Sequence, residues 1–341
     1  MTDELKKARK TFSILGFSIL SISLINYILS VIVFRIGESV SPGITSNTDF
    51  NVLVSSFTMY LVGMPFAYFC MKGLPTKKIP ERKINFGQEI TLMISAYAGG
   101  ICASFLIVEI GRFISKLTGH PMVNTAMNVL TGANAVTLIC AVILAPIMEE
   151  LVFRKLIIDR IIGYGEGVAM VVSGVFFGLM HGNLQQAFYT TFLGVFFAYV
   201  YIRTGRVRYT IIAHTFVNFI GSLLSMVIGR IDLEEMQTLV EKGINSPEYN
   251  SYVSQHLLDF ALVGLVTIVI ILLVVVGIVL MIVNIKHFHI DSKEGDLPKG
   301  ERFSTVVGNA GVICYISYFA ILIVLMLFEV SLARTLLELV S

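Results

Sequence analysis

Six polar side chains stand out in this sequence because they interrupt runs that are otherwise apolar. They are Glu149, Glu150, Arg154, His181, His214 and Asn218. An ionisable side chain within a membrane-spanning helix costs at least about 2.5–3.5 kcal/mol on insertion scales, and function is the usual reason for keeping one. A carboxylate can act as a general base, a histidine can hold a water molecule, and histidine and asparagine can donate hydrogen bonds to an oxyanion. Together these groups could hydrolyse an amide bond.

The first three of these residues lie in one stretch, VTLICAVILAPIMEELVFRKLIIDRII. If the stretch is one helix, Glu150 and Arg154 are separated by four residues and can form an ion pair across one turn. Glu149 then points about 100° away from Glu150 and can face a different partner. Pro146 removes a backbone donor, which predicts a local kink. A simpler interpretation ends the helix near residue 148, but the apolar residues that resume with helical spacing favour a continuous one.

The two histidines each share a helical face with another residue of the pattern. His181 follows Phe177 by four residues, and Asn218 follows His214 by four residues. Taken alone, His181 fits an interfacial residue, and the second pair fits a hydrogen bond between helices. The helical rise, however, places all of these groups in the inner-to-middle part of the membrane. That agreement between separate segments favours a shared site.

The composition predicts that these residues sit in a membrane protein. Charged residues make up only 14% of the chain and hydrophobic residues 55%, whereas soluble domains carry about 25% charged residues. Runs of about 17–25 apolar residues are long enough to cross the hydrocarbon core. The predicted spans are residues 12–34, 51–71, 89–111, 137–162, 167–182, 185–203, 209–229, 261–285 and 308–330. We therefore expect an all-α, polytopic transmembrane helix bundle with about nine spans.

The basic residues predict the orientation of this bundle. Lys and Arg concentrate at the N-terminus and on every second connection after it, which the positive-inside rule interprets as cytoplasmic. The N-terminus is thus expected to be cytoplasmic, and the protein to be a multi-pass protein of the cell membrane. We divide the chain into an N-terminal region at 1–134, a catalytic core at 135–229 and a C-terminal region at 230–341. Residues 112–136 are expected along the outer interface, and 230–260 as an outer loop with a surface helix.

Two mechanisms fit the polar residues. In one, a glutamate activates water directly. In the other, Glu149, His181 and His214 bind a divalent metal such as zinc, since two histidines and a glutamate form an acceptable set with an open position. No HExxH motif is present on any one helix to favour the metal. The residues alone are compatible with both mechanisms.

The ordered patterns Glu149-Glu150-x-x-x-Arg154, Phe177-x-x-x-His181 and His214-x-x-x-Asn218 resemble the three signatures of the CPBP family. This family contains the CAAX proteases and bacteriocin-processing enzymes and is also called the Abi family. The resemblance covers roughly residues 135–225. It implies that Glu149 activates the water, with Glu150 and Arg154 supporting the site. It further implies that His181 holds the water, while His214 and Asn218 stabilise the oxyanion.

We therefore expect an intramembrane endopeptidase, or metalloendopeptidase, that acts on a peptide or membrane-associated protein, in bacteriocin or peptide processing or in self-immunity. Nucleic acid is not an expected partner. A non-catalytic immunity or scaffold protein is the main alternative. A transporter is a weaker one, because carriers commonly contain repeated halves and the sequence contains no repeat.

Overall fold

The computed structural model describes residues 2–118, 135–293 and 295–327, and every regular element in those ranges is a helix. This confirms the predicted all-α, multi-pass architecture. In residues 2–118 the α-helices are α1 (Asp3–Val40), α2 (Thr48–Phe57), α3 (Met64–Met71) and α4 (Phe86–Thr118). Most of the predicted interfacial stretch at 112–136 lies outside the described residues.

The next helices form the region that contains the candidate site residues. They are α6 (Ala135–Ile139), α7 (Ala145–Glu150), α8 (Asp159–Ile161), α9 (Glu166–Leu179), α10 (Leu184–Thr204) and α11 (Val207–Ile228). The chain continues through α12 (Leu233–Lys242), α13 (Pro247–Gln255), α14 (Leu257–Asn284), α15 (Arg302–Val306) and α16 (Ala310–Leu327). Where the sequence predicted one surface helix between 230 and 260, the structure contains two, α12 and α13.

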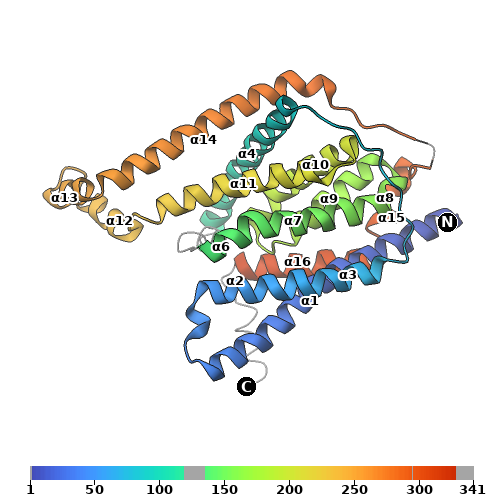
Figure 1. The fold of residues 1–341 in the computed structure, drawn as a ribbon, viewed down its shortest axis with the longest axis horizontal. Coiled ribbons are helices and arrows are strands. Elements are labelled where there is room, and N and C mark those ends of the chain that lie inside the picture. Colours follow the sequence, from blue (N-terminus) through green and yellow to red (C-terminus); the bar gives the residue numbers. More distant parts are fainter. Residues whose placement is uncertain (1, 119–134, 294, 328–341) are drawn as a thin grey trace.

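The long helices lie side by side, so that the chain runs back and forth between two ends of the molecule (Figure 1). In that view α1, α3 and α16 lie along the lower side and α14 along the upper side, with α7, α9, α10 and α11 between them. Contacts of α16 with α9 join the lower and middle groups, and contacts of α4 with both α10 and α14 join the middle and upper ones. The helices of the predicted core are therefore flanked by the N-terminal and C-terminal helices.

Among the described residues, six helical segments are long and apolar enough to cross a membrane, and α15 with α16 forms a seventh if that bent pair is one span. All nine predicted segments are mainly helical where they are described, although residues 180–182, 229 and 308–309 at the ends of three of them are not. The two that do not pass as spans are α9, which has only 14 residues, and α10. The prediction of nine crossings is thus neither confirmed nor excluded.

The surface of the bundle also fits a lipid environment. The most apolar window of α14 is only 6% buried, and Leu265, Ile268 and Leu272 on it are each 58% exposed. In water such a helix would expose an apolar patch far larger than monomeric soluble proteins tolerate. Hydrocarbon tails remove that cost because they solvate these side chains.

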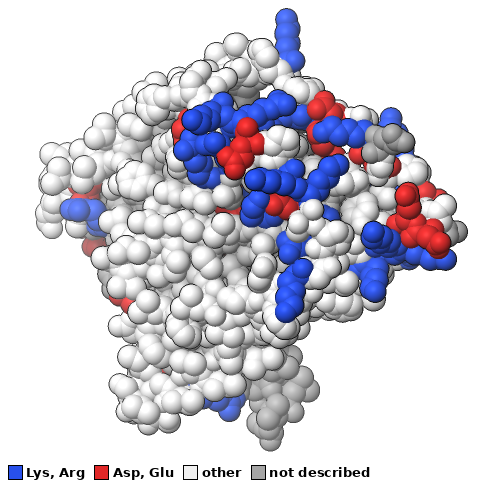
Figure 2. All heavy atoms as spheres, turned by 45° about the vertical axis from the view of Figure 1, so that its right-hand side comes forward, with Lys and Arg blue, Asp and Glu red and all other residues white. Residues whose placement is uncertain are grey.

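The charged residues gather at one end of the bundle, the right-hand end in Figure 1, which is turned forward in Figure 2. Hydrogen bonds and an ion pair join segments that the distribution of basic residues assigned to the same side of the membrane. Arg9 donates to the Gly308 carbonyl, Lys77 N–H donates to Asp159 O at 2.7 Å, and Arg203 pairs with Asp291 at 3.0 Å. We call this the basic end of the molecule. That it faces the cytoplasm stays a prediction.

Two of the helices that approach the site are locally widened before a proline. Thr58–Gly63 and Cys140–Leu144 are π-helical, and they are followed by Pro65 and Pro146. A proline has no N–H, and its ring crowds the carbonyl one turn earlier, so widening the turn relieves the clash. The kink predicted at Pro146 thus takes the form of a π segment.

Close packing of α9 against α10 depends on the two glycines of α9. A Cβ at Gly174 would lie 2.5 Å from the Val195 side chain, and a Cβ at Gly178 would lie 2.5 Å from the Ala187 carbonyl oxygen. Both distances are shorter than real Cβ contacts allow, and backbone atoms cannot move aside cheaply. The four-residue spacing of these glycines, a GxxxG pattern, thus serves helix packing.

We expect Gly178→Ala to destabilise the fold by about 1–3 kcal/mol, the usual cost of overpacking. The matched control is Gly264→Ala in α14, where a Cβ would meet nothing within 4 Å. That substitution should be neutral or slightly stabilising because alanine favours a helix more than glycine does. Thermal unfolding in detergent measures both variants. Equal melting temperatures for the two would show that the α9–α10 contact is not as tight as described.

Candidate active site

The centre of the site is a fully buried ion pair within one helical segment. Arg154 donates from Nε to Glu150 Oε2 at 2.9 Å and from Nη2 to Glu150 Oε1 at 3.0 Å, and both side chains have no exposed surface. Two parallel bonds of this kind are the strongest form of carboxylate–guanidinium contact. The pairing predicted from the four-residue spacing is present, and Leu151–Ile158, which carries Arg154, is π-helical.

The third nitrogen of the guanidinium also donates a hydrogen bond. Arg154 Nη1 donates to Ser173 Oγ at 2.8 Å, and Ser173 Oγ donates in turn to the Phe153 carbonyl at 2.8 Å. Arg154 also lies over the Phe177 ring, 4.9 Å from its centroid. The sequence analysis passed over Ser173. A lone hydroxyl in the apolar run VAMVVSGVFFG was the available signal, since such a group needs a partner when buried.

His214 lies between the two carboxylates. Its Nδ1 is 3.1 Å from Glu150 Oε1, and its Nε2 is 3.9 Å from Glu149 Oε2. A carboxylate only accepts hydrogen bonds, so Nδ1 carries a proton and Nε2 is the ring nitrogen that faces Glu149. The residue is buried. Glu150 therefore both neutralises Arg154 and orients His214.

Glu149 points away from the ion pair, as its position in the helix predicted. Its side chain is 11% exposed, and it does not form a salt bridge with Arg154, which pairs with Glu150. Instead it accepts a hydrogen bond from the Tyr60 hydroxyl at 3.4 Å. Tyr60 comes from the π segment before Pro65 and is 6% exposed. The sequence analysis missed it because it lies 89 residues away, outside all three motifs.

Phe177 sets the spacing of the two histidines. Its ring meets His181 edge-on with centroids 5.2 Å apart, and it meets His214 edge-on with centroids 5.5 Å apart. His181 Nδ1 lies 3.0 Å from the Phe177 carbonyl oxygen. Because a carbonyl oxygen can only accept, this Nδ1 carries the proton and leaves Nε2 as an acceptor. The Phe177-x-x-x-His181 pattern is thus both a packing and a hydrogen-bonding unit.

Asn218 is tied to the irregular helix that precedes Glu149. Its Nδ2 donates to the Ala141 carbonyl at 2.8 Å. In the π segment Ala145 N–H bonds to Cys140 O, so the next N–H in that register would belong to residue 146, which is proline. The Ala141 carbonyl therefore lacks a backbone donor, and Asn218 supplies one from α11. One N–H of the amide is used in this way, and one is left.

The structure brings together the side chains of Glu149, Glu150, Arg154 and His214, with His181 joined to them through Phe177 and Asn218 on the same face of α11 as His214. The metal set that the sequence allowed was Glu149, His181 and His214. Within the described residues, no group of three or more His, Cys, Asp or Glu side chains is placed to hold a metal ion. The metal set of Glu149, His181 and His214 therefore stays a prediction.

Comparison with known proteins relates this site to a known family. Residues 131–220, which include all of the motif residues, match the family model described as type II CAAX prenyl endopeptidase Rce1-like. Over this segment the chain is similar to membrane peptidases of that kind, in agreement with the resemblance of its motifs to the CPBP family. A protein of Bacillus subtilis strain 168 named as a membrane peptidase, YdiL, is 29% identical over 174 residues, covering 48% of this chain and 70% of YdiL.

Two eukaryotic relatives carry the name CAAX prenyl protease 2. The protein of Arabidopsis thaliana is 30% identical over 145 residues, covering 36% of this chain and 43% of its own length. The human protein is 32% identical over 100 residues, covering 23% of this chain and 30% of its own length. The matched regions thus span less than half of these two relatives. No solved structure matches this chain.

We expect Arg154→Met to destabilise the fold by about 3–5 kcal/mol because it leaves the Glu150 charge buried and unpaired. The double variant Glu150→Gln/Arg154→Met removes both charges and keeps an oxygen that can accept from His214. It should recover most of the lost stability. Thermal unfolding in detergent measures the three proteins. Unfolding of the double variant at the same temperature as Arg154→Met would contradict the electrostatic explanation.

Proposed function

We propose that this protein is an intramembrane endopeptidase that hydrolyses a peptide bond with water activated by Glu149. The observation that carries the proposal is the different surroundings of two adjacent carboxylates. Glu150 is occupied by Arg154 and His214, whereas the polar contacts of Glu149 within the described part of the chain are with the Tyr60 hydroxyl and the Nε2 atom of His214. Glu149 is therefore the carboxylate that can accept a proton from water. The names of the relatives support the reaction class.

In the proposed first step, water bound between Glu149 and His181 attacks the peptide carbonyl. The His181 Nε2 acceptor holds one water hydrogen, and the Glu149 carboxylate takes the other as the O–C bond forms. A carboxyl group results on Glu149, together with a tetrahedral oxyanion. When the C–N bond breaks, Glu149 returns that proton to the departing amine. The atoms of one water molecule are thereby divided between the two products.

The oxyanion would be held by His214 and Asn218. Donation from His214 Nε2 requires a doubly protonated ring, because Nδ1 already donates to Glu150. Asn218 would donate its second N–H, while the first stays on Ala141. Losing a single donor of this kind typically costs about 10²–10³ in kcat. Both donors lie on α11, four residues apart.

We further propose a positioning role for Tyr60, which lies outside the segment matched by the family model. Its hydroxyl donates to Glu149 from the side opposite to α11, so that the carboxylate is held between two helices. The substrate would be a peptide or membrane-associated protein that reaches this site from the bilayer. A CAAX-like prenylated peptide, a bacteriocin precursor, and a peptide handled in self-immunity are the candidates to be tested.

Glu149→Gln is expected to abolish peptide cleavage while leaving expression, membrane insertion and melting temperature close to wild type. The assay uses the purified full chain in liposomes with quenched peptide libraries, prenylated and unmodified, with and without a chelator. The matched control is Glu248→Gln on α13, an exposed residue that should leave cleavage unchanged. Cleavage at the wild-type rate by Glu149→Gln would refute the mechanism. A toxin-protection phenotype that survives this substitution would favour the non-catalytic immunity interpretation.

Tyr60→Phe is expected to lower kcat roughly tenfold with little change in KM, because a hydrogen bond to a charged group contributes about 1.5–3 kcal/mol and substrate binding does not involve the phenol. Tyr97→Phe is the control, since Tyr97 is equally buried, at 3% exposed, and packs edge-on to Phe216 away from the carboxylates. Steady-state kinetics on the best library peptide separate kcat from KM. Equal losses in the two variants would reduce the role of Tyr60 to general packing.

A further inference from the structure

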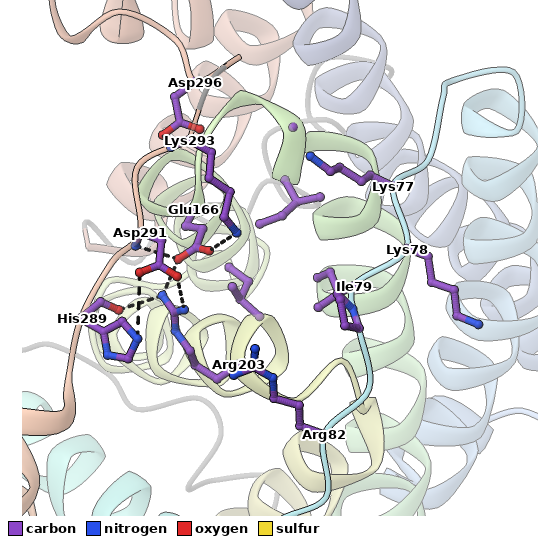
Figure 3. Close-up of a pocket in the computed structure, with 14 residues that line it drawn as sticks. Lys77, Lys78, Ile79, Arg82, Glu166, Arg203, His289, Asp291, Lys293 and Asp296 are labelled. Atoms are coloured by element: carbon purple, nitrogen blue, oxygen red, sulfur yellow. Dashed lines mark hydrogen bonds and ion pairs between the residues drawn. The ribbon is translucent and has the colours of Figure 1, made fainter.

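A separate pocket lies at the basic end of the molecule, away from the paired carboxylates (Figure 3). It encloses about 180 Å³, compared with about 10–15 Å³ needed by one water molecule. Four parts of the chain line it: segment 77–82, the turn between α8 and α9, the end of α10, and the segment that follows α14. The motif residues of the candidate active site do not contribute to it.

One wall of the pocket is made of charges that compensate one another. Glu166 accepts hydrogen bonds from Arg203, from Lys293 Nζ at 3.1 Å and from the Asp291 N–H at 3.0 Å. Arg203 also donates to Asp291 at 3.0 Å, and this contact holds the pKa of the Asp291 carboxyl below its usual value. Two of the three acidic side chains that line the pocket, Glu166 and Asp291, are thus paired with basic ones, and the third, Asp296, accepts the backbone N–H of Lys293 at 3.2 Å.

The opposite wall carries cations without such compensation. Lys77 and Arg82 line the pocket from the segment between α3 and α4, and in Figure 3 both extend toward the wall of Glu166 and Arg203. Among the described residues, no carboxylate lies within salt-bridge distance of either side chain. Glu81, between them in sequence, is paired with Arg206 at 2.9 Å. The lining therefore has more basic than acidic side chains, and the excess lies on this wall.

This wall is held in place by the backbone. Lys77 N–H donates to Asp159 O and Arg82 N–H donates to Thr204 O, each at 2.7 Å. Gly205, at φ 63°, lets the chain pass so close that a Cβ there would lie 2.6 Å from the Pro80 carbonyl oxygen. Both ends of segment 77–82 are thereby fixed against the helices of the core. The two cations project from a positioned segment rather than from an unattached loop.

From this arrangement we propose that the pocket binds a phosphate group, with Lys77 and Arg82 as its principal ligands. The buried apolar side chains of Ile79 and Ile202 contribute to the lining and suit the apolar portion of a larger molecule. At a membrane surface the abundant phosphate belongs to lipid headgroups, and basic pockets between helices are known to hold them. Free phosphate or a phosphorylated metabolite offers the same chemistry. The proposal does not depend on the peptidase mechanism.

The test is lipid binding by the full chain in a neutral detergent, followed by native mass spectrometry. The probes are phosphatidylglycerol, inorganic phosphate, and phosphatidylcholine as the zwitterionic comparison, in which the phosphate charge is balanced by the headgroup's own ammonium. Wild type should retain one phosphatidylglycerol in preference to phosphatidylcholine. Lys77→Gln/Arg82→Gln should weaken that binding roughly thirtyfold, about fivefold for each cation removed near the surface. Size-exclusion profiles and melting temperatures check that the variants are folded.

The matched control is Lys10→Gln/Lys83→Gln. It removes the same charge from two exposed lysines that lie outside the pocket lining, one of them in the same connection between α3 and α4. Binding in this control should change less than about threefold, since the effect of one distant surface charge is screened. Equal weakening in both double variants would overturn the proposal because it would indicate general surface attraction. Failure of wild type to bind either probe would overturn it as well.

The two phosphate probes distinguish the source of the ligand. Binding of phosphatidylglycerol that inorganic phosphate does not displace would identify a lipid headgroup site. Displacement by millimolar inorganic phosphate would identify a phosphate site open to soluble ligands. Both results support the site, provided that the Lys77→Gln/Arg82→Gln variant loses the binding and the control variant keeps it.

Discussion

The Arg154–Glu150 pair is the interaction on which the rest of the site depends. Moving two ions out of water costs several kcal/mol for each ion, and their mutual attraction offsets this only when the remaining donors and acceptors are also satisfied. Here the guanidinium uses Nε, Nη1 and Nη2, and Glu150 also accepts from His214. These bonds connect the segment that carries the pair to α9 through Ser173 and to α11 through His214.

The same pair creates the difference between the two glutamates. Without Arg154, two adjacent carboxylates and a histidine in an apolar interior would compete for protons. With Arg154 assigned to Glu150 by two bonds, Glu149 keeps its own surroundings of Tyr60 and His214. The close contact of α9 with α10 at Gly174 and Gly178 fixes the position of Phe177 on α9. Both histidine rings pack against the Phe177 side chain. The Arg154–Glu150 ion pair and the packing of α9 against α10 therefore together determine how the two glutamates and the two histidines are arranged.

The spacing of residues within one helix predicted the contacts that such spacing controls. It predicted the Glu150–Arg154 pair, the different direction of Glu149, and the common face of His214 and Asn218. It did not predict Tyr60, since a contact across 89 residues depends on which helices are neighbours. Nor did it separate α9 from the longer spans, because the apolar run at 167–182 continues beyond Leu179, where the helix ends after 14 residues.

The π segments explain why Asn218 was only partly understood from the sequence. In a regular α-helix, a proline leaves the carbonyl four residues earlier, here that of Val142, without its N–H donor. In the five-residue register the deprived carbonyl is Ala141, and this is the one that Asn218 binds. Pro146 and Asn218 thus act as one unit, in which the proline frees an acceptor and the asparagine fills it. Because that bond fixes the amide plane, the second N–H of Asn218 is held in one direction before any substrate arrives, which is the preorganisation that oxyanion binding requires.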